Sequence, residues 1–199
     1  MNTELRERIL RIYSSIRSVE ETDMQKLKAN MIVTEKITAV CQNFRGGLTN
    51  EELTNLSYTL IHNIANLHDH LKKWALHNGK DKEKVDGAIA QSLELQIIKD
   101  LSNNDKHGYP PRDGGLSGKC PKLLNVNRIM GLKPKKMKGS TIRMTLDAAG
   151  ETKIFGDGTA KAIITGDVVD NKDIRIGDLN KIATKAVEAW EQLLADFDL

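Results

Sequence analysis

The stretch DLSNNDKHGYPPRDGG, residues 100–115, gathers carboxylate, amide, ammonium and imidazole groups where a helix is expected to end. On a helix, Gln96, Asp100, Asn103 and His107 follow one another at spacings of four, three and four, so they share one stripe. Histidine is the side chain best suited to proton transfer near neutral pH. We therefore predict a catalytic set in which His107 is the acid or base and Asn103 and Asp100 orient it.

Two cations close to this stripe could bind a phosphate. Lys106 and Arg112 lie near His107 in the sequence, and both carry the positive charge that an anion requires. A plainer reading stays open, because Asn, Asp, Lys, His and Gly are also common at helix C-termini and in turns. On that reading the polar turn is a structural helix cap.

The run NNDKHGY, residues 103–109, resembles the signature of HEPN-domain proteins, in which a helix ends in Arg-Asn-x-x-x-His and continues as His-x-Tyr. Asn103, His107, Gly108 and Tyr109 match this pattern, whereas Ser102 stands in the place of the arginine. The resemblance covers one helix end within the helical part of the chain. It implies metal-independent RNA cleavage in a site formed across a homodimer, with histidine handling protons and arginine stabilising the phosphate.

Because Ser102 replaces the motif arginine, the resemblance implies cleavage only if Lys106 or Arg112 takes over the role of that arginine. The spacing Asp-x-x-Asn-x-x-Lys-His is also similar to that of uncharacterised bacterial helical proteins, for which the resemblance implies no activity.

A basic segment follows the polar turn. Residues 114–146 hold eight basic and no acidic side chains, whereas the whole chain has a net charge of only +3. Such a segment supplies sequence-independent attraction to phosphates, and we predict nucleic-acid binding by its lysines. The segment has no aromatic residue, so it predicts no stacking platform for single strands. The alternative is a solvated loop balanced by the acidic C-terminal region. The predicted nucleic-acid-binding residues are Lys119, Lys122, Lys133, Lys135, Lys136 and Lys138.

No pattern predicts a metal or a cofactor. His62, His68, His70 and His77 fall on one expected helix, but none is three or four residues from another, which shared ligation from a helix requires. No segment approaches the ~18 apolar residues of a membrane span, and the N-terminus does not read as a signal peptide. We therefore expect a cytoplasmic protein that does not enter a membrane.

Helical periodicity dominates the first half of the chain. Apolar residues recur every three or four positions over residues 3–18, 18–44, 50–77 and 81–107, and they do so again from Asp178 to the C-terminus. Capping boxes at Ser18 and Thr49 mark two of the helix starts. Alternation at 142–146 and the Asp157-Gly158 turn predict a small antiparallel β-meander.

These elements predict a mainly α single domain, an up-and-down bundle of four to five helices with the β-meander inserted before the last helix. The expected parts are a helical bundle (1–110), a basic loop (111–139), an antiparallel β insert (140–172) and a C-terminal helix that completes the bundle (173–199).

Two functions follow from these readings. The first is a HEPN-like protein that binds or cleaves RNA, in a toxin–antitoxin or phage-defence setting, as a homo-oligomer. The alternative is a non-catalytic helical interaction protein with a protein partner, in which the polar turn only caps a helix.

Overall fold

The computed structural model describes residues 3–21, 29–33, 38–42, 44–110, 114–133, 135, 138–147 and 151–199, and all structural statements below refer to these. The chain forms five helices and eight strands within these residues. The helices are α1 (Thr3–Ser18), α2 (Asn50–His77), α3 (Glu83–Gln91), α4 (Leu93–His107) and α5 (Leu179–Asp196). The strands are β1 (Glu20–Glu21), β2 (Ala29–Val33), β3 (Thr38–Gln42), β4 (Lys122–Lys133), β5 (Ile142–Leu146), β6 (Thr152–Gly156), β7 (Thr159–Val169) and β8 (Arg175–Asp178).

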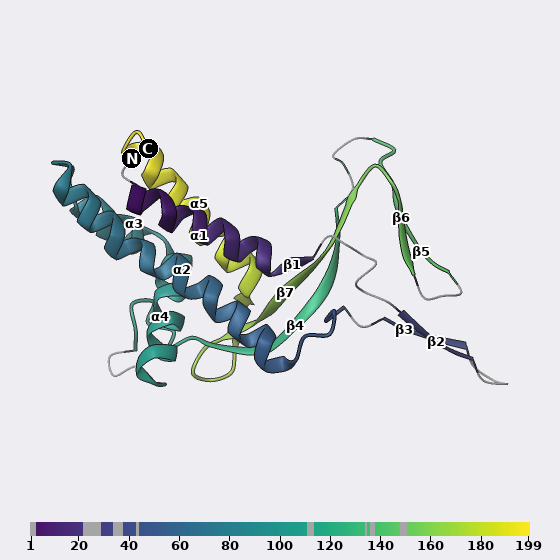
Figure 1. Cartoon of the computed structure of the whole chain (residues 1–199). Helices are drawn as coiled ribbons and strands as arrows, with labels where there is room; N and C mark the ends of the chain where they lie inside the picture. Colours follow the sequence, from purple (N-terminus) through teal and green to yellow (C-terminus); the bar gives the residue numbers. More distant parts are fainter. Residues whose placement is uncertain are drawn as a thin grey trace.

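The helices gather at one end of a long two-stranded ribbon, and two β-hairpins lie toward its other end (Figure 1). The ribbon consists of β4 and β7, which pair antiparallel from Lys122↔Val169 to Lys133↔Thr159. Strands β1 and β8 both pair with β7, on the edge that β4 leaves open. The β2–β3 and β5–β6 pairs are separate two-stranded sheets.

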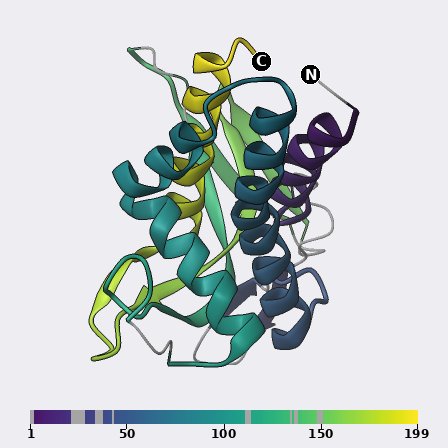
Figure 2. The same cartoon turned by 90° about the vertical axis from the view of Figure 1, so that its left-hand side faces the viewer.

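The core forms where helices pack on one another and on the inner half of the ribbon. Ile164 and Val168, which point to the same side of β7, join the buried residues of all five helices in one hydrophobic cluster. Trp190 of α5 is buried there, and its indole N–H donates to the carbonyl of Ile64 in α2 at 3.1 Å. Figure 2 shows the helices from the side that faces away from the hairpins.

The helix predictions for the N-terminus, for residues 50–77 and for the C-terminus are confirmed. Thr49 forms the predicted capping box with Glu52, and Asn78 follows the last residue of α2. Asp178 caps α5 by accepting the N–H of Asn180 at 2.9 Å. The helix expected over 81–107 is instead two helices, because Ser92 adopts an extended conformation and caps α4.

The predicted mainly α bundle is wrong, because the chain has a mixed α/β fold in which strands form part of the core. Residues 18–44, expected to be helical, contain β1, β2 and β3. Their β-branched residues Ile32, Val33, Thr38 and Val40 favour strands, and this preference outweighs the approximate helical spacing.

The predicted basic loop is also wrong, because its residues 122–133 form strand β4. The pairing of β4 with β7 shifts register between Leu124 and Asn127, where Asn125 has φ +52°. This bulge breaks the alternation that marks a strand. Opposite it, a side chain at Gly166 would approach Leu123 within 2.9 Å, so only glycine fits without a shift.

The antiparallel strands expected before the last helix are present, but their partners differ from the prediction. Residues 152–156 pair with β5 rather than across the Asp157-Gly158 turn, and β7 pairs with β4. Among the described residues, no helix has both the length and the apolar character needed to cross a lipid bilayer.

Candidate functional site

Asp100, predicted to orient an imidazole, anchors a loop instead. Its side chain is 2 % exposed and accepts three hydrogen bonds: from the N–H of Leu116 at 2.7 Å, and from the N–H and Oγ of Ser117 at 2.8 and 2.6 Å. A Cβ on Gly115 would lie 2.6 Å from the carboxylate, so the loop backbone passes directly over it. The carboxylate therefore holds residues 115–117 against α4.

Asn103 and His107 lie on the surface of the last turns of α4, and both are exposed. Lys106 is also exposed, and its Nζ donates to Oδ1 of Asn66 in α2 at 2.9 Å. The predicted phosphate ligand Arg112 lies outside the described residues. The structure therefore places Asn103, Lys106 and His107 together at the end of α4, with Asp100 separated from them by its burial.

A polar seam between α2 and α4 was missed by the sequence analysis. Nδ1 of His62 lies 2.8 Å from Oγ of Ser102, and Nε2 lies 2.8 Å from Oδ2 of Asp105. The ring of Tyr58 stands 6.0 Å from that of His62, and burial, followed by the charge of Asp105, raises the pKa of Tyr58. The paired residues of the seam are 40 or more positions apart in the sequence. Residue spacing within a single helix therefore could not have predicted this pairing.

Ser102 decides what this seam can do. It occupies the place of the motif arginine, yet it is only 1 % exposed, and its hydroxyl is engaged with His62. A nucleophilic serine must reach its substrate. The Ser102, His62 and Asp105 chain therefore ties α4 to α2 rather than presenting a reactive hydroxyl.

A second polar cluster lines a hollow of about 360 Å³ between α2, α3 and α4. Nε2 of His68 bonds to Asp86 at 2.7 Å, and Nζ of Lys99 donates to Nδ1 of the same ring at 3.0 Å. Asp69 lies 3.0 Å from this Nδ1 as well. One nitrogen cannot accept from Lys99 and donate to Asp69 at once, so Lys99 and Asp69 compete for this nitrogen.

The two lysines of this cluster, Lys72 and Lys99, have pKa values that are shifted in opposite directions. Burial lowers the pKa of Lys99, against the opposing influence of Asp69. A hydrogen bond to Asp86, 2.7 Å away, raises the pKa of Lys72, and the same bond, together with that to His68, lowers the pKa of Asp86. Lys99 therefore gives up its proton more readily than an ordinary lysine, whereas Lys72 keeps its proton.

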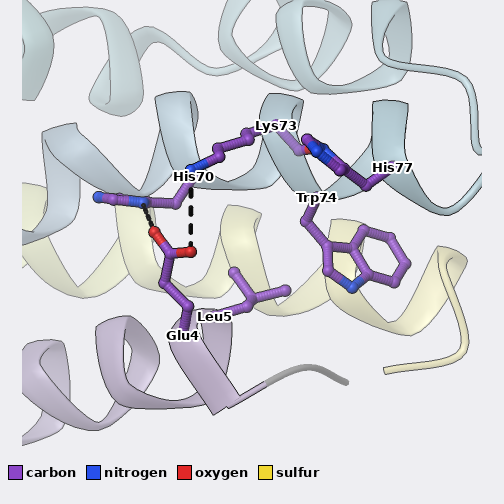
Figure 3. Close-up of a pocket in the computed structure, with 6 residues that line it drawn as sticks. All are labelled: Glu4, Leu5, His70, Lys73, Trp74 and His77. Carbon is purple, nitrogen blue, oxygen red and sulfur yellow. Dashed lines mark hydrogen bonds and ion pairs between the residues drawn. The ribbon is translucent and has the colours of Figure 1, made fainter.

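Another hollow, of about 290 Å³, lies between the start of α1 and the last turns of α2 (Figure 3). His70 and Lys73 both point toward Glu4, at 3.4 and 3.9 Å, and the buried Leu5 and Trp74 form its apolar wall. His70 and Lys73 are both engaged by the same carboxylate, which leaves little charge for a ligand. Within the described part of the chain, no group of His, Cys, Asp and Glu is placed to hold a metal ion.

The predicted nucleic-acid-binding lysines separate into two groups along the ribbon. Near the helices, Lys122 pairs with Asp173 at 2.5 Å and lies 5.8 Å from the ring of Tyr109, while Lys119 is exposed on the preceding loop. At the far end, Lys133, Lys135 and Lys138 are exposed. Lys136 lies outside the described residues.

Arg143 of β5 extends the distal group, because it is exposed at the same end of the molecule. We call Lys133, Lys135, Lys138 and Arg143 the distal cations. In the described residues, no carboxylate forms an ion pair with any of them.

Comparison with known proteins found no match to a family model, to a curated protein or to a solved structure. The HEPN resemblance therefore stays a prediction that rests on residues 102–109 alone.

Proposed function

We propose that this protein binds RNA through the distal cations. The observation that carries the proposal is their freedom from ion pairs within the described chain, at the end of the molecule remote from the helices. By contrast, the ribbon lysines Lys122 and Lys161 pair with Asp173 and Glu20. Unpaired lysines and arginines gain more from a phosphate, because they exchange only counterions and water for it.

The projecting two-stranded ribbon suits this task, because its outer end lies away from the helices (Figure 1). Each phosphate contact lowers the logarithm of the affinity by about 0.7 to 0.9 per tenfold rise in salt. Engagement of the four distal cations therefore gives a slope of roughly −3 for either form of RNA.

The proposal covers binding and does not extend to cleavage. Ser102, at the place of the motif arginine, is buried, and the Asp100 carboxylate accepts its three hydrogen bonds from residues 116 and 117 of the following loop. His107 would thus act without the arginine of the HEPN pattern and without the carboxylate that was predicted to orient it. Among the residues that the structure describes there, Lys106 is the exposed lysine beside it at the end of α4.

The test is a titration of labelled mixed-sequence RNA at two salt concentrations, scored for binding and for cleavage. The test variant changes Lys133, Lys135, Lys138 and Arg143 to Gln. We expect it to lose most of its affinity and to flatten the salt dependence, because the phosphate contacts are gone.

A matched variant controls for net charge. It removes one arginine and three lysines that are exposed on the helices or in the turn between α2 and α3, at Arg6, Lys80, Lys84 and Lys181. It is expected to bind almost as well as the unmodified protein. Equal losses in the two variants, or no binding at low salt, would refute the proposal. Cleavage that disappears in the His107→Ala variant would show that the proposal is too narrow.

A second candidate, a protein-binding role, is favoured by exposed apolar residues on the same ribbon. Ile129 and Leu132 of β4 are 49 % and 45 % exposed. Failure of RNA to bind, together with recovery of a stable complex whose affinity falls on Ile129→Ser substitution, would favour this role.

A further inference from the structure

The register of the β5–β6 hairpin brings an aromatic side chain beside the basic segment. Arg143 of β5 stands directly opposite Phe155 of β6, and Thr145 stands opposite Lys153. Side chains of directly opposed residues, and of residues two apart on one strand, lie on the same face of a sheet. One face of the hairpin therefore carries Arg143, Phe155, Thr145 and Lys153, and all four are exposed.

The other face of the hairpin turns toward the ribbon. Ile154 is partly buried and packs in a small cluster around Ala162 of β7, and Thr152 is 5 % exposed. A slip of one residue in the register would exchange the two faces. The packing of Ile154 thus fixes the outward direction of Phe155, whose exposed fraction is 52 %.

We propose that the RNA bound by this protein is single-stranded and that one of its bases stacks on Phe155 beside Arg143. This inference rests on the proposed RNA binding and specifies the form of RNA that is bound. The face of a base is accessible to an aromatic ring only when the strand is unpaired, and aromatic stacking tolerates every base.

Charge complementarity selects a nucleic acid as the occupant of this face. The guanidinium of Arg143 lies across from the ring and can contact a phosphate or a neighbouring base plane. Lys153 on the same face pairs with Asp147 at 3.3 Å, whereas the distal cations continue the positive charge toward the ribbon. An apolar ring with Arg143 opposite it and Lys153 on the same face suits a stacked base joined to phosphates better than it suits an apolar protein surface.

Sequence reading excluded such a platform because residues 114–146 contain no aromatic side chain. Phe155 lies beyond that segment, and only strand pairing brings it to Arg143. The absence of an aromatic residue holds for the segment, and the proposed stacking depends on a ring from outside it.

The experiment measures fluorescence anisotropy with one labelled 20-nucleotide unstructured RNA, free or annealed to its complement. We expect the unmodified protein to prefer the single strand by about tenfold. Phe155→Ala should weaken single-strand binding by roughly 5- to 150-fold, the range typical of one stacked base. Duplex binding and the salt slope should stay unchanged, and Phe155→Trp should retain tight binding.

Leu132→Ala is the matched control, because Leu132 is an exposed apolar residue near the end of β4, outside the hairpin face that carries Phe155. It should bind as the unmodified protein does. Equal loss in Leu132→Ala and Phe155→Ala would overturn the stacking role, as would a Phe155→Ala variant with unchanged single-strand affinity.

Three outcomes separate this inference from the proposed function. Salt-sensitive binding without strand preference would refute the inference alone. Absence of binding to either RNA would refute both. A homodimer, detected by sedimentation, that dissociates in Phe155→Ala would assign this face to a second copy of the chain and would also overturn the inference.

Discussion

Asp100 of α4 has a structural role that its residue type alone does not reveal. Asp100 carries the carboxylate that a catalytic set would need, but its oxygens are occupied by Leu116 and Ser117 of the following loop. A buried carboxylate with three donors is a strong local anchor, because each donor would otherwise lose its water without compensation. The same residue type thus fits both readings, and only the contacts decide between them.

Replacement of Asp100 by Asn should destabilise the protein by about 2 kcal/mol, because an amide group would turn a donor toward the loop donors. Ser117→Ala, which removes one of the three bonds, should cost about 1 kcal/mol. Urea denaturation followed by circular dichroism measures both changes. An Asp100→Asn variant as stable as the unmodified protein would show that the carboxylate does not anchor the loop.

Lys99 predicts a distinct pH dependence. Its pKa is lowered, first by burial, so above this lowered pKa and below the ordinary value near 10.4 the unfolded chain binds a proton that the folded chain has released. Stability should therefore rise with pH in this alkaline window through Lys99. The unfolding free energy of Lys99→Met should rise less over the same window.

The control for Lys99 is Lys84→Met, at an exposed position of α3, which should preserve the pH profile of the unmodified protein. The neighbouring groups His68, Asp69 and Asp86 remain in both variants. Parallel profiles for Lys99→Met and the unmodified protein would contradict the assignment.

At the scale of elements, sequence signals succeeded where local chemistry and tertiary packing agree. Thr49 and Glu52 form their capping box, and α2 buries the apolar residues Leu53, Leu60, Ile64, Leu67, Leu71 and Trp74. Ser18 and Glu21 carry the same spacing, yet Ser18 ends α1 and its hydroxyl donates to the carbonyl of Ser15 at 2.7 Å.

This difference predicts unequal costs for the two alanine variants. Thr49→Ala should lower the free energy of unfolding by about 1 kcal/mol, because the N–H of Glu52 loses its acceptor. Ser18→Ala should change it by less than about 0.5 kcal/mol, because Ser18 is exposed and caps no helix start. Equal costs in denaturant titrations would contradict the two assignments.

Strands were harder to predict than helices for a physical reason. The bulge at Asn125 breaks the period of β4, and the identity of the partner strand depends on contacts that no local pattern encodes. The candidate sites were hard to predict for the same reason. His62 and Ser102 come from two helices, and Arg143 and Phe155 come from two strands. Residue types could be read from the sequence, but their neighbours could not.

The whole molecule has two parts, a helical body that contains the core and an outer end of the ribbon that carries the distal cations (Figure 1). Lys133 of β4 and Thr159 of β7 are the last paired residues of the ribbon. Because these two residues are already opposite one another, the chain between them can be replaced by a two-residue Asn-Gly turn, which closes antiparallel strands.

Excision of residues 134–158 in this way should leave the stability of the body within about 1 kcal/mol of the original, since the main hydrophobic cluster has no member there. RNA affinity should fall at least as far as in the variant of the distal cations. Thermal unfolding and anisotropy measure the two effects. A variant that unfolds far earlier, or that binds RNA normally, would contradict this division.

The burial of both tryptophans has a practical consequence for spectroscopy. The chain contains two tryptophans, Trp74 and Trp190, and both lie in the core of the helical body. Their emission should report on melting of the body and should be insensitive to events at the hairpins. The unmodified protein is therefore spectrally silent at its outer end, where a tryptophan introduced at Phe155 would act as an optical probe of a bound base.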